Sequence, residues 1–113
     1  MPARRGPTLD DLGRMVEVVA PACGWLVQLP AGPSRDWGPV LLCRDGVAVW
    51  LFLTGQTDLR DNQRPWWKAI TSSGGYCVHF RSREIVELFD FLRAPPLDDI
   101  RPHIDDRRYD STD

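Results

Sequence analysis

Residues 40–53, VLLCRDGVAVWLFL, decide the fold, because two apolar runs flank the dipeptide Asp45-Gly46. Asp-Gly between two apolar runs is the strongest short signal for a tight β-hairpin, since these residues tolerate the positive φ angles that the turn requires. The sequence therefore predicts a strand over 40–43 and a return strand over 47–53. The return run has no charged residue, which is typical of a central strand covered on both faces.

The segment before the hairpin predicts one helix and one strand. Thr8 is an expected N-cap, with Asp11 three residues later as an approximate capping box. Apolar residues then recur at helical spacing: Leu12, Met15, Val16 and Val19. Pro21 is expected to stop this helix. A first strand is expected over 25–29, and the proline-rich segment 30–39 is expected to be a loop.

The segment after the hairpin predicts a helix, a strand and a second helix. A loop over 55–60 leads to a crossover helix that Asp61 caps and that ends near Ser73. A fourth strand is expected over 76–80, followed by a helix that Ser82 caps. The inward stripes are expected at Trp66, Ala69, Ile70 and Ser73 in the first helix and at Ile85, Leu88, Phe89 and Leu92 in the second. The order αβββαβ with a C-terminal helix predicts a mixed sheet of the α/β class.

Length and composition predict one domain. The chain has 113 residues, 42% of them hydrophobic, which suits one buried core. We expect residues 1–7 to form a disordered lead, 8–93 the domain, and 94–113 an irregular acidic tail rich in proline and aspartate. No apolar run approaches about 18 residues. No apolar segment follows Arg4 and Arg5 either, so neither a membrane span nor a secretory signal is expected.

Charge and cysteine content restrict the function classes. The formal net charge of −2 disfavours a dedicated polyanion binder. Cys23, Cys43 and Cys77 are odd in number and form no C-x-x-C pair, so we expect buried thiols in a reducing cytoplasm and neither a disulfide framework nor a metal site. His79 and His103 fit no triad or metal-ligand pattern and are expected to be packed or solvated.

Six short sequence phrases follow one another along the chain in a characteristic order. They are Gly24-Trp25, Gly38-Pro39, Arg44-Asp45-Gly46, Leu59 with Gln63 and Trp66, Gly74-Gly75-Tyr76, and Phe80-Arg81-Ser82. In order and spacing they resemble the VRR-NUC group of the PD-(D/E)xK nuclease superfamily, over residues 8–92. The resemblance implies a restriction-endonuclease-like αβββαβ core and relatives, similar to Holliday-junction resolvases, that cleave DNA with a divalent metal.

The same resemblance places the catalytic positions, and there the sequence departs from the family. The family's first acid follows the proline at the start of the second strand, which places it at Val40. The family's E-x-K pair falls on Leu51 and Leu53. Lys68 is the only lysine in the chain and stands two residues after Trp66, so no E-x-K or D-x-K exists in any register. Because Mg²⁺ needs oxygen ligands, we expect no catalytic residue and no metal cofactor here.

Acidic residues elsewhere keep a second interpretation open. Asp10, Asp11 or Glu17 would be the helix-borne acid of some relatives, or ordinary solvated charges. An active nuclease with relocated ligands, using Mg²⁺ or Mn²⁺, would draw on Asp10, Asp36, Asp45 or Asp58. Asp58 and Asp61 are favoured instead as a turn former and a helix cap.

Six residues are candidates for binding a partner. They are Trp37, Arg60, Gln63, Arg64, Trp67 and Arg81. Gln63 matches a glutamine common in the resembled family and either faces the former active site or hydrogen-bonds the preceding loop. The arginines, together with Arg83, form either a phosphate-binding face or a solvated surface. Trp66 is expected in the core, while Trp37 and Trp67 either anchor an interface or cover the core edge.

These observations predict an inactive nuclease-fold protein that acts by binding. A small, arginine-rich, solitary domain of this type resembles those that phages and other mobile elements carry, so the expected partner is a host or phage protein, with nucleic acid as the alternative. No membrane partner is expected, and the expected location is the cytoplasm, that of the bacterial host for a phage protein. The two other hypotheses are the active nuclease described above and a structural subunit that forms oligomers such as a homodimer.

Overall fold

The computed structural model describes residues 6–29, 37–96 and 100, apart from the side chains of Trp37 and Gly38. In this part of the chain the elements follow the predicted order. They are α1 (Leu9–Ala22), β1 (Leu26–Gln28), β2 (Trp37–Arg44), β3 (Val47–Thr54), α2 (Arg64–Ser72), β4 (Cys77–Arg81), a 3₁₀ turn (Ser82–Glu84) and α3 (Ile85–Arg93). The molecule is a mixed α/β fold, as the sequence predicts.

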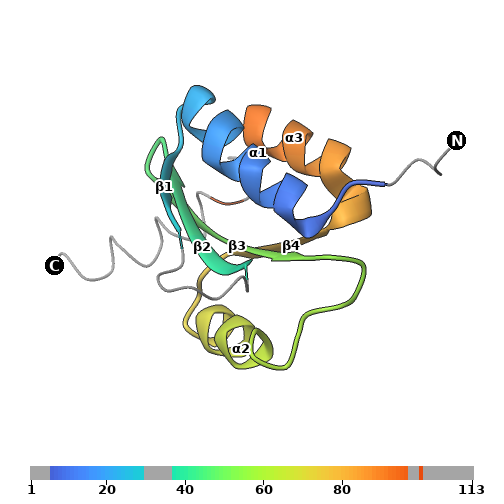
Figure 1. Cartoon of the computed structure of the whole chain (residues 1–113). Helices are drawn as coiled ribbons and strands as arrows, with labels where there is room; N and C mark the ends of the chain where they lie inside the picture. The colour runs from blue at the N-terminus through green and yellow to red at the C-terminus, as the bar shows by residue number, and fades with distance from the viewer. Residues whose placement is uncertain (1–5, 30–36, 97–99, 101–113) are drawn as a thin grey trace, which may run out of the picture.

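Within the described ranges the strands form a single sheet in the order β1-β2-β3-β4. β1, β2 and β3 are antiparallel neighbours, and β4 joins β3 in parallel after the α2 crossover. Figure 1 shows α1 and α3 side by side on one face of the sheet and α2 on the other. We call these the α1/α3 face and the α2 face. Since successive side chains of a strand point to opposite faces of the sheet, the residues of β3 alternate between the α1/α3 face and the α2 face.

The turn between β2 and β3 confirms the hairpin prediction. Asp45 has φ 53° and Gly46 has φ 83°, the pair of positive angles that a tight two-residue hairpin needs. β2 begins at Trp37, so the expected loop 30–39 is too long at its C-terminal end. The register shifts between Trp37 and Val40, and this irregularity lets the Gly38-Pro39 segment join the strand.

The main core lies between the sheet and the α1/α3 pair. Its buried members include alternate residues of β3 and the inward stripes of both helices: Leu12, Val16, Ala20, Val49, Leu51, Leu53, Leu88 and Leu92. Trp25 is buried beside them, and its indole Nε1 donates to the carbonyl oxygen of Leu92 at 2.8 Å. Ile100 is also fully buried in this core, although the sequence assigns it to the irregular tail.

The predicted helix ends are partly corrected. Thr8 and Asp11 form the expected capping box, with each side chain accepting from the other residue's backbone N–H. Pro21 lies inside α1, because a proline in the last turn removes only one hydrogen bond before the helix ends at Ala22. Ser82 starts a 3₁₀ turn and makes no side-chain cap, and Glu84 accepts from the backbone N–H of Arg81 instead.

The expected inward stripe of α2 is out of phase. Gln63, rather than Asp61, occupies the N-cap, and no residue of α2 is fully buried. Gln63, Trp67 and Ile70 face the sheet at i, i+4, i+7 spacing, while Trp66 is 57% exposed. The prediction that Trp66 enters the core was therefore wrong, and Trp67 takes that place. Its ring meets Phe52 of β3 edge-on at 5.3 Å between centroids.

The stripe of α3 needs a similar correction. Leu88 and Leu92 are buried as expected, but Phe89 is 40% exposed. Phe91 is the aromatic residue that faces inward. Its ring centroid lies 6.2 Å from that of Trp25 and 5.8 Å from that of Phe80. None of the helices in the described ranges is long and apolar enough to cross a lipid bilayer. The three cysteines, each partly buried, form no disulfide.

Candidate functional site

The three positions at which the resemblance predicts catalytic residues are buried and apolar. Val40 of β2 and Leu51 of β3 are direct cross-strand partners, and both are fully buried. Leu53, two residues further along β3, is buried in the same cluster. All three lie on the α1/α3 face, beneath the two helices. A phosphate cannot reach these positions without displacing a helix, and their side chains offer no oxygen or nitrogen ligand.

Those of the acidic residues considered as relocated ligands that the structure describes lie on separate elements. Asp10 is exposed on α1, Asp45 lies in the hairpin turn, and Asp58 lies in the loop after β3. Asp36 lies outside the described residues. Across the described part of the chain, no group of three or more His, Cys, Asp or Glu side chains is placed to hold a metal ion. The structure thus assembles no alternative carboxylate cluster from the residues it describes.

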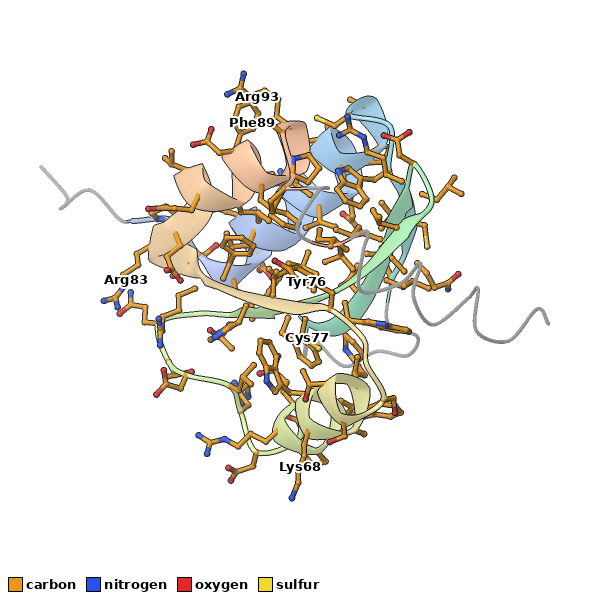
Figure 2. The ribbon with its side chains drawn as sticks, turned by 180° about the vertical axis from the view of Figure 1, so that it is seen from behind. Lys68, Tyr76, Cys77, Arg83, Phe89 and Arg93 are labelled. Carbon is orange, nitrogen blue, oxygen red and sulfur yellow. The ribbon has the colours of Figure 1, made fainter. Side chains whose placement is uncertain are left out.

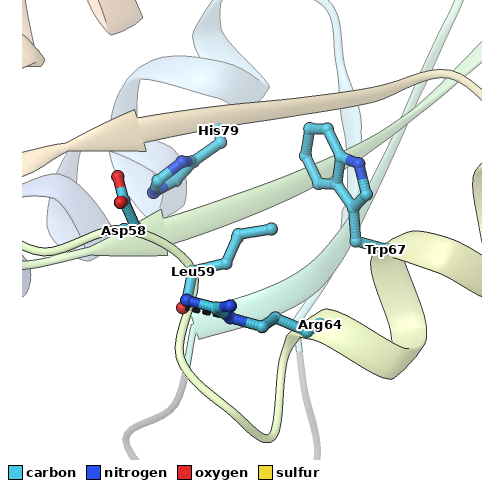
Figure 3. Close-up of a pocket in the computed structure, with 5 residues that line it drawn as sticks. All are labelled: Asp58, Leu59, Arg64, Trp67 and His79. Atoms are coloured by element: carbon cyan, nitrogen blue, oxygen red, sulfur yellow. Dashed lines mark hydrogen bonds between the residues drawn. The ribbon is translucent and has the colours of Figure 1, made fainter.

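The α2 face carries a pocket of about 400 Å³ between α2, the preceding loop and β4. It is lined by Asp58, Leu59, Arg64, Trp67 and His79, which Figure 3 shows at close range. We call it the α2 pocket. Volumes of about 300–1,000 Å³ are typical of small-molecule sites. The lining combines an indole, an imidazole, a guanidinium and a carboxylate, so the pocket can hold a flat ring and a charged group together.

His79 is oriented by a hydroxyl on the neighbouring strand. Its Nε2 lies 2.9 Å from Oγ1 of Thr54, and that hydroxyl donates to the carbonyl oxygen of Thr57 at 2.7 Å. A hydroxyl has one proton to donate, so Thr54 must accept from Nε2–H of His79. The opposite ring nitrogen, Nδ1, makes no hydrogen bond with any described residue. Burial lowers the pKa of His79, and the nearby Arg81 guanidinium lowers it further, against the opposing charges of Glu84 and Asp58. A neutral ring then offers Nδ1 as an acceptor.

Asp58 is held by Arg81, which links the loop to β4. The Arg81 guanidinium donates to Oδ1 of Asp58, and this hydrogen bond and its charge hold the pKa of Asp58 below its usual range. Arg81 also lies 3.8 Å from Oε1 of Glu84. The carboxylate is exposed and stays ionised at neutral pH. Its second oxygen, Oδ2, makes no hydrogen bond within the described residues.

Arg64 supplies a positive charge that no described carboxylate neutralises. Its Nε donates to the carbonyl oxygen of Leu59 at 3.0 Å, which anchors the side chain at the first residue of α2 (Figure 3). The terminal nitrogens form no ion pair with the described carboxylates, although Arg64 is close enough to lower the pKa of Asp58. A guanidinium fixed in this way presents two parallel donors to an anion.

The six predicted binding residues have different fates. Arg64 and Trp67 line the α2 pocket, and Arg81 supports it through Asp58. Gln63 is buried: its amide donates to the carbonyl oxygen of Leu53 at 3.0 Å and accepts from the backbone N–H of Arg60 at 2.8 Å. The loop-holding interpretation of this glutamine is the one that the structure shows.

Two of the predicted residues contribute no described side-chain contact to the pocket. Arg60 is exposed in the loop before α2, and the side chain of Trp37 lies outside the described part of the chain. Arg83, weighed with the arginine face, is exposed in the 3₁₀ turn. Of these four arginines, Arg64 and Arg81 both lie close enough to Asp58 to lower its pKa.

Sequence reasoning gave His79 no binding role, and it considered Asp58 only as a turn former or a relocated metal ligand. A signal was present in β4, where Cys77, His79 and Arg81 alternate with the apolar residues Val78 and Phe80. This alternation indicates a strand with one face in contact with polar surroundings. No protein-family model, no curated protein and no solved structure matches this chain.

Proposed function

We propose that this protein acts by binding a macromolecular partner and does not cut nucleic acid. The supporting observation is the buried pair Val40 and Leu51, with Leu53 beside it. In the nucleases that the sequence resembles, these positions hold a metal against a phosphate. Here they complete a hydrophobic core, where a lone carboxylate would cost several kcal/mol, about 2–7 even for an uncharged polar group.

The partner belongs to one of two classes, a protein of the host cell or a nucleic acid. We propose that the domain belongs to a phage or another mobile element and alters a host process by occupying its partner. The features that support binding lie on the α2 face, where the pocket opens and where Trp66 is exposed. Exposed tryptophan is enriched at binding hot spots.

Incubation of the purified protein with supercoiled plasmid tests this function. With Mg²⁺ or Mn²⁺ present, the plasmid should stay supercoiled. The Val40→Ala variant serves as a control, because it adds no metal-binding side chain and only enlarges the space at this buried position. Cleavage by the wild-type protein that a chelator abolishes would overturn the proposal. If the plasmid stays intact, capture of bound molecules from a bacterial lysate identifies whether the partner is a protein or a nucleic acid.

A further inference from the structure

We propose that the α2 pocket binds one unpaired nucleotide, with its base against Trp67 and its phosphate at Arg64. The inference deepens the proposed function and rests on it, because it names the chemistry of a bound partner. It starts from three groups around one space that no described residue hydrogen-bonds: the terminal nitrogens of Arg64, Nδ1 of His79 and Oδ2 of Asp58. Arg64 and His79 both lie close enough to Asp58 to lower its pKa.

The apolar part of the pocket fits a flat ring. Trp67 is fixed by its edge-on contact with Phe52, which is itself fully buried, so the indole is a rigid wall. Leu59 adds an apolar surface from the loop. Stacking of a base on an aromatic side chain contributes about 1–3 kcal/mol and does not depend on sequence.

The polar part distinguishes a nucleobase from other flat rings. Nδ1 of His79 and Oδ2 of Asp58 are both acceptors in the neutral and ionised states that the structure supports. Adenine and cytosine each carry an exocyclic amine with two N–H donors, and guanine adds a ring N–H, whereas a phenylalanine or tryptophan side chain of a peptide offers at most one donor. A nucleotide therefore satisfies the pocket better than an aromatic peptide does.

The charge of the pocket sets the charge of the ligand. Asp58 is paired with Arg81, which leaves Arg64 as the cation without a described carboxylate partner. One such cation suits the single negative charge of a phosphodiester. The free mononucleotide and the unpaired nucleotide of a single strand share this chemistry, while a base inside a duplex cannot leave its stack without cost.

The indole N–H signals of the intact ¹⁵N-labelled protein provide a direct test. The chain has five tryptophans, and single Trp→Phe substitutions assign the signals of Trp66 and Trp67. A short single-stranded oligoadenylate should shift the Trp67 signal and leave the Trp66 signal in place. Adenosine monophosphate in a parallel titration distinguishes the two sources: equal affinity assigns a free nucleotide, and tighter binding of the strand assigns nucleic acid.

Two matched arginine variants measure the phosphate contact. Arg64→Gln should weaken binding about tenfold, the loss expected for one charge-assisted hydrogen bond. Arg83→Gln, an exposed arginine outside the pocket, should leave the affinity within about twofold of the wild type. His79→Gln keeps a donor for Thr54 but removes the ring acceptor, and it should also weaken binding.

Several results would overturn the inference. These are an unmoved Trp67 signal, equal losses in the two arginine variants, full competition by inorganic phosphate, equal binding of a blunt duplex, or tighter binding of a tryptophan-containing peptide. The plasmid assay separates this inference from the proposed function. Metal-dependent cleavage would remove the function while the Trp67 titration still reported on the pocket.

Discussion

The two faces of the sheet are built from alternate residues of the same strands, yet they are covered in different ways. The α1/α3 face presents Leu51 and Leu53 to two helices, each of which has fully buried inward residues. The α2 face presents Phe52 and Thr54 to one short helix, none of whose residues is fully buried. Figure 2, seen from behind, shows α2 as a separate layer with Cys77 of β4 between it and the α1/α3 pair. The comparison teaches that one face of the sheet serves the hydrophobic core, while a pocket remains on the opposite face.

The strongest way to break this comparison is to place a charge on the α1/α3 face. Leu51→Glu places a carboxylate at a fully buried position. It should destabilise the fold by about 4–5 kcal/mol or more, which is comparable to the total stability of many domains. Urea unfolding followed by circular dichroism measures the loss. Leu51→Met, which nearly keeps the volume, should cost less than about 1.5 kcal/mol. A glutamate variant as stable as the wild type would mean that this face is open to water.

The adjacent tryptophans sharpen the comparison on the α2 face. Trp67→Ala removes the ring that meets Phe52 and should cost about 2–4 kcal/mol. Trp66→Ala changes a residue that is 57% exposed and should cost less than about 1 kcal/mol. Thermal unfolding of the two variants in one buffer decides the order. Equal losses would place both rings at the border of the core.

The approach of α2 to the sheet depends on a glycine. A methyl group at Gly75 would lie 2.5 Å from Cγ2 of Ile70 and 3.3 Å from Cδ1 of Trp50. Gly75→Ala should therefore cost about 1–3 kcal/mol as helix and strand are pushed apart. Gly55→Ala is the matched control, because nothing lies within 4 Å of its added methyl group. A neutral Gly75→Ala variant would show that α2 adjusts its position freely.

The smallest expected effect is a pH dependence from His79. Burial and Arg81 lower its pKa, so the unfolded chain binds a proton more tightly than the folded protein does. Stability should therefore fall as the pH drops through and below the ordinary histidine value of about 6.5. Melting temperatures from about pH 7.5 to about pH 5.5 should decline less in His79→Gln than in the wild type. Asp58 stays ionised across this range, since Arg81 lowers its pKa. Parallel curves for the two proteins would contradict the effect.

Local signals predicted most of the fold. The Asp45-Gly46 turn, the Thr8 cap and the apolar stripe of α1 each act within a few residues, and the structure confirms them. The phase of α2 was wrong because Trp66 and Trp67 are adjacent on a helix of nine residues, where two phases fit almost equally well. Only the sheet beneath decides between them, through Phe52.

The pocket could not be predicted because its parts come from distant segments. Thr54 meets His79 across 25 residues, and Asp58 meets Arg81 across 23. Neither pair has a spacing that sequence alone favours. The sequence itself shows that Val40, Leu51 and Leu53 are aliphatic. The structure adds that these three side chains are fully buried.

One carbonyl oxygen joins parts of the chain that lie far apart. Leu92, near the end of α3, accepts from the indole of Trp25 at 2.8 Å and from the guanidinium of Arg44 at 3.4 Å. A polypeptide shortened before this residue would bury an indole N–H with no acceptor, at a cost of about 1–3 kcal/mol. During synthesis on the ribosome, Trp25 and Arg44 therefore gain these hydrogen bonds only after α3 has been made. Deletion mapping from the carboxyl end should show an abrupt loss of protease resistance at this turn.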